Sequence, residues 1–99
     1  MSCGKPALSL FGKVNTSEFA NSGSFSESGW MQTWNALYPS KTSFGSSGGS
    51  AVSVAADFAA AAMGSQTGVS LYAPTTSASL KSFCGTDGMA STTGVLPLT

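Results

Sequence analysis

A glycine- and serine-rich stretch, residues 44–50, is the first feature of the sequence that could do chemistry. It reads Phe-Gly-Ser-Ser-Gly-Gly-Ser and runs directly into an alanine-rich segment. A loop of this kind at the start of a helix directs several backbone N–H groups at one point, which suits a phosphate or the oxyanion of acyl transfer. The P-loop lysine and the glycine spacing of a dinucleotide fingerprint are both absent. The oxyanion interpretation requires a nucleophile, and serine is the only abundant candidate.

The base that such a serine needs cannot be an imidazole, because the sequence contains no histidine. A lysine that burial keeps neutral can serve instead, directly or through a second hydroxyl. Histidine metal ligands are excluded as well, and Cys3 and Cys84 match no zinc spacing. We therefore expect neither a metal nor a cofactor. The two thiols are interpreted as buried or incidental, with a disulfide between them as the alternative.

Charge is scarce in this sequence, where four lysines balance four acidic residues and charged residues make up 8%. Independent domains carry about a quarter charged residues, so this chain resembles the interior part of something larger. Four scattered lysines form no basic stripe for nucleic acid. The longest apolar run is shorter than the roughly 20 residues of a membrane span, and no signal peptide is visible. We expect a soluble protein, cytoplasmic by default, with neither nucleic acid nor membrane as partner.

The segments before the loop predict short and irregular elements. Residues 7–14 alternate apolar with small or polar residues, which suits a strand, and Thr16 or Ser17 could cap a helical turn over residues 18–20. Residues 21–29 are typical of an irregular loop. Residues 30–38 suit a short helix or a packed loop, which Pro39 would end.

The segments after the loop complete an α/β pattern. Residues 51–63 predict a helix that is apolar on nearly every face and hence buried, with Gly64 as its C-cap. Residues 69–72 predict a short buried strand that ends before Pro74, and three glycines predict turns in the tail: Gly85, Gly88 and Gly94. These elements are too few to enclose a core, so the pattern predicts an open piece of an α/β domain.

Three blocks of the sequence resemble the amidase signature family. Residues 45–51, the following helix and residues 64–74 are similar to a GSS(G/S)GS stretch, a helix and a G-T-D-x-G-x-S-[apolar]-R-x-P stretch. Residues 12–20 are similar to the family's GKxNxSEFA segment. A downstream set falls in register with GLKPTxGxVSxxGxxP: Thr86, Gly88, Ser91, Gly94 and Pro97. Nearly the whole chain is covered by this resemblance.

The resemblance implies a partial amidase-signature domain over residues 1–99, part of a mixed β-sheet flanked by helices. Its parts would be the signature loop 44–50, the buried helix 51–63 and the nucleophile segment 64–74. The chain would then be incomplete alone and would require the rest of the amidase polypeptide as its partner.

The resemblance also implies a Ser–cisSer–Lys triad that hydrolyses a small carboxamide through an acyl-enzyme. Ser70 would be the nucleophile, and Ser46, 24 residues earlier, would be the bridging serine after a cis peptide bond. Backbone N–H groups of four residues would form the oxyanion hole: Thr67, Gly68, Val69 and Ser70. Small neighbours would support the loop: Gly45, Ser47, Gly48 and Gly49.

The sequence departs from the family pattern where the triad lysine should be. That lysine belongs to a VKD-like motif far upstream of the loop, and no such motif exists here. None of the four lysines, Lys5, Lys13, Lys41 and Lys81, occupies its position. Gln66 and Tyr72 also replace an acid and an arginine of the family, a joint change that leaves no orphan charge.

Three hypotheses remain from the sequence. The first is an amidase segment whose lysine is supplied from elsewhere, and the second is a catalytically incomplete fragment or non-enzymatic remnant. The third is a glycine- and serine-rich module that cradles an anion, which the spacing of Ser46 and Ser70 disfavours. An unpartnered apolar helix and exposed strand edges further predict aggregation or a molten state for the isolated chain.

Overall fold

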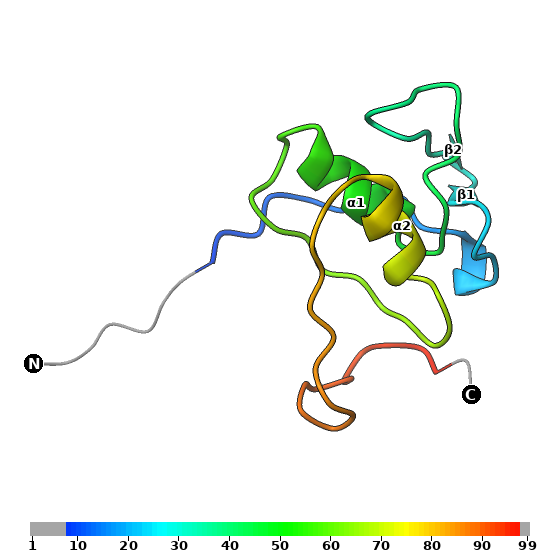
Figure 1. The fold of residues 1–99 in the computed structure, drawn as a ribbon. Helices are drawn as coiled ribbons and strands as arrows, with labels where there is room; N and C mark the ends of the chain where they lie inside the picture. The colour runs from blue at the N-terminus through cyan, green and yellow to red at the C-terminus, as the bar shows by residue number, and fades with distance from the viewer. Residues whose placement is uncertain (1–7, 98–99) are drawn as a thin grey trace, which may run out of the picture.

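The computed structural model describes residues 8–97. Its elements in chain order are the 3₁₀ helix η1 (Glu18–Ala20), strands β1 (Glu27–Ser28) and β2 (Met31–Gln32), and helices α1 (Gly48–Ala55) and α2 (Tyr72–Ser77). The two α-helices lie side by side at the centre, with the small hairpin of β1 and β2 on one flank (Figure 1). Both helix and strand are present, as the sequence predicts, but the sheet has only two antiparallel strands.

The hairpin is the first departure from the predicted elements. Glu27 pairs with Gln32 and Ser28 with Met31, so a two-residue turn joins the strands. The alternative of a helix over residues 30–38 is therefore wrong. The side chains that suggested helical spacing are mostly in solvent, with Trp30 87% exposed, because nothing in the described chain covers them.

Helix α1 corrects the prediction of a buried helix over residues 51–63. It begins earlier, inside the signature loop, and it ends at Ala55 before Asp57 adopts a positive φ of 60°. Burial is confined to its first turn, Gly48 to Ala51, while Phe58 and Met63 are exposed. Short helices are marginal in water without packing, and the alanine-rich residues 56–63 have no surface to pack on. Gly64 consequently caps no helix.

Helix α2 replaces the buried strand predicted for residues 69–72. Residues 68–71 form a turn, and the helix then runs through Pro74 to Ser77. Proline is tolerated in a first helical turn because the N–H groups there have no helical acceptor. Pro74 is fully buried, and Thr75 Oγ1 donates to the Leu71 carbonyl at 2.6 Å. Pro74, which the sequence predicted to end a strand, instead packs inside a helix.

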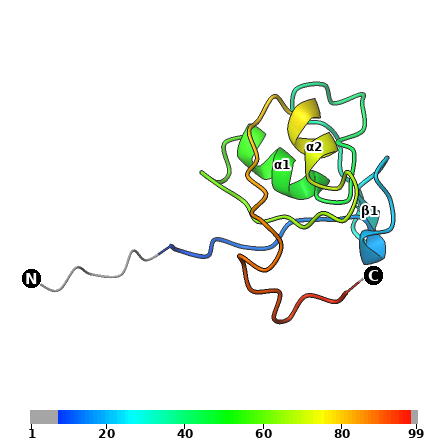
Figure 2. The same cartoon turned by 60° about the horizontal axis from the view of Figure 1, so that its bottom comes forward.

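The two ends of the described chain are irregular. Residues 8–14 form no strand, and Leu10 is 95% exposed. A strand there would need a neighbour that residues 8–97 do not provide. Gly88 and Gly94 do lie in turns, as predicted, whereas Gly85 does not. Cys84 is exposed rather than buried, and Cys3 lies outside the described residues. Figure 2 shows the tail running away from the helices.

The interior of the described chain is made mostly of small polar residues. Its buried apolar side chains are Ala51, Pro74 and Ala78. The buried polar residues are more numerous: Ser17, Ser26, Asn35, Ser43, Ser46, Ser47, Ser50 and Thr75. Every buried side-chain N or O atom among the described residues has a hydrogen-bond partner. Within residues 8–97, no helix reaches the length and apolar content that a membrane crossing requires.

Candidate active site

The signature loop is the most deeply buried segment, with every residue from Gly45 to Ser50 buried. The Gly45 N–H donates to the Gly23 carbonyl at 2.9 Å, and the Ser46 carbonyl accepts from the Ser17 N–H at 3.0 Å. The peptide bond between Gly45 and Ser46 is cis, as the resemblance predicts for Ser46. Segments upstream of the hairpin thus hold this part of the loop.

All three glycines of the loop are required by their surroundings, and a Cβ on Gly49 would collide with the backbone of Asn15. A Cβ on Gly45 would collide with the carbonyl oxygens of Ser22 and Phe25, and a Cβ on Gly48 would collide with the hydroxyls of Ser26 and Ser43. Any larger residue would push the neighbouring backbone or hydroxyls away. The supporting role that the resemblance implies for these glycines stays a prediction.

The serines of the loop reach the nucleophile segment. The Ser47 N–H donates to the carbonyl of Ser70 at 3.0 Å, which brings the residue after Ser46 beside the predicted nucleophile. Ser47 also exchanges hydrogen bonds with the backbone of Ser65, through its hydroxyl, at 3.2 and 3.3 Å. The Ser50 hydroxyl donates to the Met63 carbonyl at 2.6 Å. These contacts attach residues 63–70 to the loop.

The two predicted catalytic serines lie in different environments. Ser46 is 1% exposed, whereas Ser70 is half-buried at the turn before α2. Within residues 8–97, no hydrogen bond joins their hydroxyls directly. The structure therefore brings their backbones together through Ser47 without forming a hydroxyl relay.

The predicted oxyanion-hole donors lie on the turn between Gln66 and α2. The N–H groups of Thr67, Gly68, Val69 and Ser70 donate to no acceptor within the described residues. An oxyanion hole needs such free N–H groups, directed at one point. The turn is closed by Gln66, whose Oε1 accepts from the N–H groups of Leu71 at 3.0 Å and Tyr72 at 2.7 Å.

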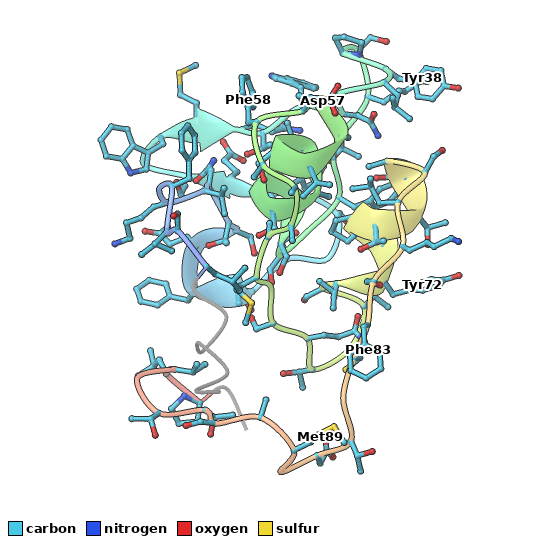
Figure 3. The ribbon with its side chains drawn as sticks, turned by 90° about the vertical axis from the view of Figure 1, so that its left-hand side faces the viewer. Tyr38, Asp57, Phe58, Tyr72, Phe83 and Met89 are labelled. Atoms are coloured by element: carbon cyan, nitrogen blue, oxygen red, sulfur yellow. The ribbon has the colours of Figure 1, made fainter. Side chains whose placement is uncertain are left out.

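Tyr72 does not partner Gln66 through its side chain. Its ring is 64% exposed and points away from the body of the molecule (Figure 3). The amide oxygen of Gln66 instead caps the backbone at the start of α2. Gln66 and Tyr72 are thus connected by a hydrogen bond from the Tyr72 main-chain N–H to the Gln66 side chain.

The lysines of the described chain do not supply a base. Lys13, Lys41 and Lys81 are all exposed, and no hydrogen bond links their ammonium groups to Ser46 or Ser70 in the described structure. Lys5 lies outside the described residues. No cluster of three or more metal-ligating side chains occurs among residues 8–97.

Two cavities lie near the signature loop, and neither is lined by Ser46 or Ser70. One of about 520 Å³ lies beside η1 and β1, where Glu18 and Glu27 line it. The other, of about 340 Å³, lies beside α1 and α2 and is lined by Ser47, Ala51 and Leu71 among others. The second cavity opens next to the nucleophile turn, since Leu71 directly follows Ser70.

Sequence reasoning missed the residues that hold the loop from outside. Asn15 donates from Nδ2 to the Met31 carbonyl at 2.9 Å and to Thr33 Oγ1 at 3.0 Å, and its carbonyl accepts from the Gly49 N–H at 3.0 Å. The block 12–20 contains Asn15, so the resemblance marked its segment without giving it a role. Ser26 carried no signal at all, because it lies in a serine- and glycine-rich stretch interpreted as irregular loop.

The signature loop and the turn before α2 are joined by the hydrogen bond from the Ser47 N–H to the Ser70 carbonyl. The family model described as Amidase matches residues 6–99. The chain belongs to the amidase family.

Relatives within that family share about two-fifths of the matched residues. The chain is 42% identical over 87 residues to a glutamyl-tRNA(Gln) amidotransferase subunit from Desulforudis audaxviator. It is 45% identical over 85 residues to the corresponding protein from Thermodesulfovibrio yellowstonii. Each match covers 86–88% of this chain but only 16% of the relative, so the chain spans a small part of these proteins. No solved structure matches the chain.

Proposed function

We propose that this chain forms the nucleophile-bearing part of a serine amidase that hydrolyses the C–N bond of a small carboxamide. The proposal rests on one observation above all, the hydrogen bond from the Ser47 N–H to the Ser70 carbonyl. That bond supports the proposal because it joins the signature loop to the turn whose four N–H groups, in residues 67–70, have no acceptor among residues 8–97. Ser70 acts as nucleophile, Ser46 as the bridging serine, and a lysine from outside this chain as the base.

The reaction assigns one role to each part. The Ser70 hydroxyl attacks the amide carbonyl while its proton passes through Ser46 to the lysine, and the N–H groups of residues 67–70 stabilise the oxyanion. The C–N bond then breaks, and the amine leaves with the relayed proton. Water attacks the resulting ester, which releases the carboxylic acid and restores the Ser70 hydroxyl.

The exposed apolar side chains support a place within a larger core. Among the described residues, Leu8, Leu10, Phe11, Phe58 and Met63 are all more than two-thirds exposed. Contiguous apolar surface of this kind is normally covered by partner structure. We place the chain in a mixed β-sheet flanked by helices, completed by the rest of an amidase polypeptide that also carries the lysine.

One observation favours a second candidate, a catalytically incomplete remnant. The three lysines of the described chain are exposed and contact neither Ser46 nor Ser70. A serine without its base retains little of its reactivity, so the chain alone would be inactive even with an intact loop. The two candidates differ in whether the Ser70 hydroxyl becomes reactive once a lysine is supplied.

A chimera separates these candidates. This 99-residue chain replaces the matching segment of the Thermodesulfovibrio yellowstonii relative, to which it is 45% identical over 85 residues. The relative then supplies the missing lysine strand. We expect a fluorophosphonate probe to label the chimera about 10²-fold or more faster than the isolated chain, the scale of general-base catalysis.

The matched control is the Ser70→Ala chimera. If the folded parent chimera reacts no faster than this variant, Ser70 is not an activated nucleophile and the remnant hypothesis stands. If both the isolated chain and the chimera react at the same high rate, the base lies within this chain and the proposed lysine supply is wrong.

A further inference from the structure

Ser26 is a fully buried serine that the proposed reaction does not use. It lies one residue before β1, and its side chain is 0% exposed. Its hydroxyl accepts from the Gly48 N–H at 2.8 Å and donates toward the carbonyls of Phe44 at 2.8 Å and Ser46 at 3.1 Å. One side chain therefore contacts the main chain of the signature loop at three points.

Two of these contacts, with Phe44 and Gly48, flank the Ser46–Ser47 pair, and the third is with Ser46 itself. A hydroxyl carries one proton and two lone pairs, so the two carbonyls share its proton while a lone pair receives the Gly48 N–H. The Ser26 Oγ atom thus lies on the inner side of the loop's bend. It links Phe44, one residue before the cis Gly45–Ser46 bond, to Gly48, the first residue of α1.

Ser26 is itself held firmly. Its carbonyl accepts from the Thr33 N–H at 2.8 Å, which connects it across the hairpin. On the other side, the space beside it is closed, because a Cβ on Gly48 would collide with both the hydroxyl and the Cβ of Ser26. An alanine would leave the buried Gly48 N–H without an acceptor, and a threonine would add a methyl group where there is no room.

We propose that Ser26 is a positioning residue, which fixes the main chain around Ser46 and so sets the Ser46 hydroxyl relative to Ser70. This inference rests on the proposed function for its effect on reactivity, but its effect on the loop stands apart from that function. Ser26 touches no substrate; it acts through the backbone of Phe44, Ser46 and Gly48.

The test of the loop uses the complete chain within the chimera and hydrogen exchange resolved to single amides. We expect the Gly48 amide to exchange about tenfold faster in Ser26→Ala, the effect of one lost buried hydrogen bond. The Thr75 amide, which bonds to the Leu71 carbonyl, reports whether the rest of the chain stays folded and should not change. Ser53→Ala removes a hydroxyl that bonds only the Ser50 carbonyl and should leave Gly48 exchange unaltered.

The test of reactivity is fluorophosphonate labelling of the same variants. We expect Ser26→Ala to lower the maximal labelling rate about tenfold with an unchanged half-saturating probe concentration, and Ser26→Cys to recover part of the loss.

An unchanged Gly48 exchange rate, or a labelling rate equal to that of the parent, overturns the proposal. Faster exchange of the Thr75 amide would show that Ser26→Ala unfolds the chain. In that case the Gly48 exchange rate and the labelling rate of Ser26→Cys decide whether the proposal holds. If the parent itself does not label, the proposed function fails, and Gly48 exchange still decides whether Ser26 holds the loop.

Discussion

The signature loop and the outer segments of this chain differ in their burial and in the hydrogen bonds that hold them. Residues 45–50 are glycines and serines, all of them buried, and nearly every one is fixed by a hydrogen bond to a neighbouring segment. Residues 8–14 and 83–97 hold large apolar side chains in solvent and form no regular element. The contrast indicates that hydrogen bonds within the chain define the loop, whereas the outer segments depend on surfaces outside it.

The largest stability effect should come from filling the space inside the loop. Gly48→Ala places a Cβ against the hydroxyls of Ser26 and Ser43, so we expect it to destabilise the chimera by about 3 kcal/mol. Gly29→Ala is the control, because nothing lies within 4 Å of the added Cβ. Urea unfolding of the two variants measures the difference. Equal stabilities would show that the loop is not closely packed.

A smaller effect is expected from the residue that ties the loop to the hairpin. Asn15→Ala removes the bonds from Nδ2 to Met31 and Thr33 and leaves the Ser28 hydroxyl without its acceptor. We expect a loss of about 2 kcal/mol in urea unfolding of the chimera, since the site is half-buried. The exposed Asn21 serves as the control for the same substitution. An identical loss at Asn21 would contradict a specific role for Asn15.

The cap at the nucleophile turn should matter less. Gln66→Ala removes the acceptor for the Leu71 and Tyr72 N–H groups, which should cost about 1 kcal/mol, as for other helix caps. Gln66→Glu keeps an acceptor and should preserve most of that stability. Amide exchange at Leu71 and Tyr72 measures the effect directly. Exchange that is unchanged in Gln66→Ala would mean that the turn is held by other contacts.

The smallest effect is expected in the outer segments. Leu10 is 95% exposed, so Leu10→Ser in the isolated chain should leave the exchange rates of the Gly48 and Thr75 amides unchanged within about twofold. Hydrogen exchange resolved to single amides measures both rates. Clearly faster exchange at either amide would show that residues 8–14 pack within this chain, and the contrast between the two regions would disappear.

The sequence predicted the loop better than the elements around it. The composition of residues 44–50 indicated a loop that leads into a helix, and the resemblance indicated the cis bond before Ser46. Those features depend on residues within the loop itself. The contacts of Ser26 and Asn15 could not be predicted, because they arise only when segments far apart in sequence meet.

The wrong predictions share a physical cause. The helix over residues 51–63 and the strand over residues 69–72 were inferred from apolar content, which predicts burial only where something covers the segment. Helix α1 stops at Ala55, just before the exposed residues 56–58, and residues 69–72 instead lead into α2, which contains the buried Pro74. The apolar residues of these two segments therefore led to a prediction of burial that the described residues do not provide.

The most direct test of the central claim is to locate the covalent adduct by mass spectrometry after fluorophosphonate labelling of the chimera. The chain contains many serines, and the proposed function assigns the nucleophile to one of them, Ser70, on the family resemblance. We expect a single adduct on Ser70, with none on Ser46 or Ser47. An adduct on another serine of this chain, or none on a folded chimera, would contradict the claim.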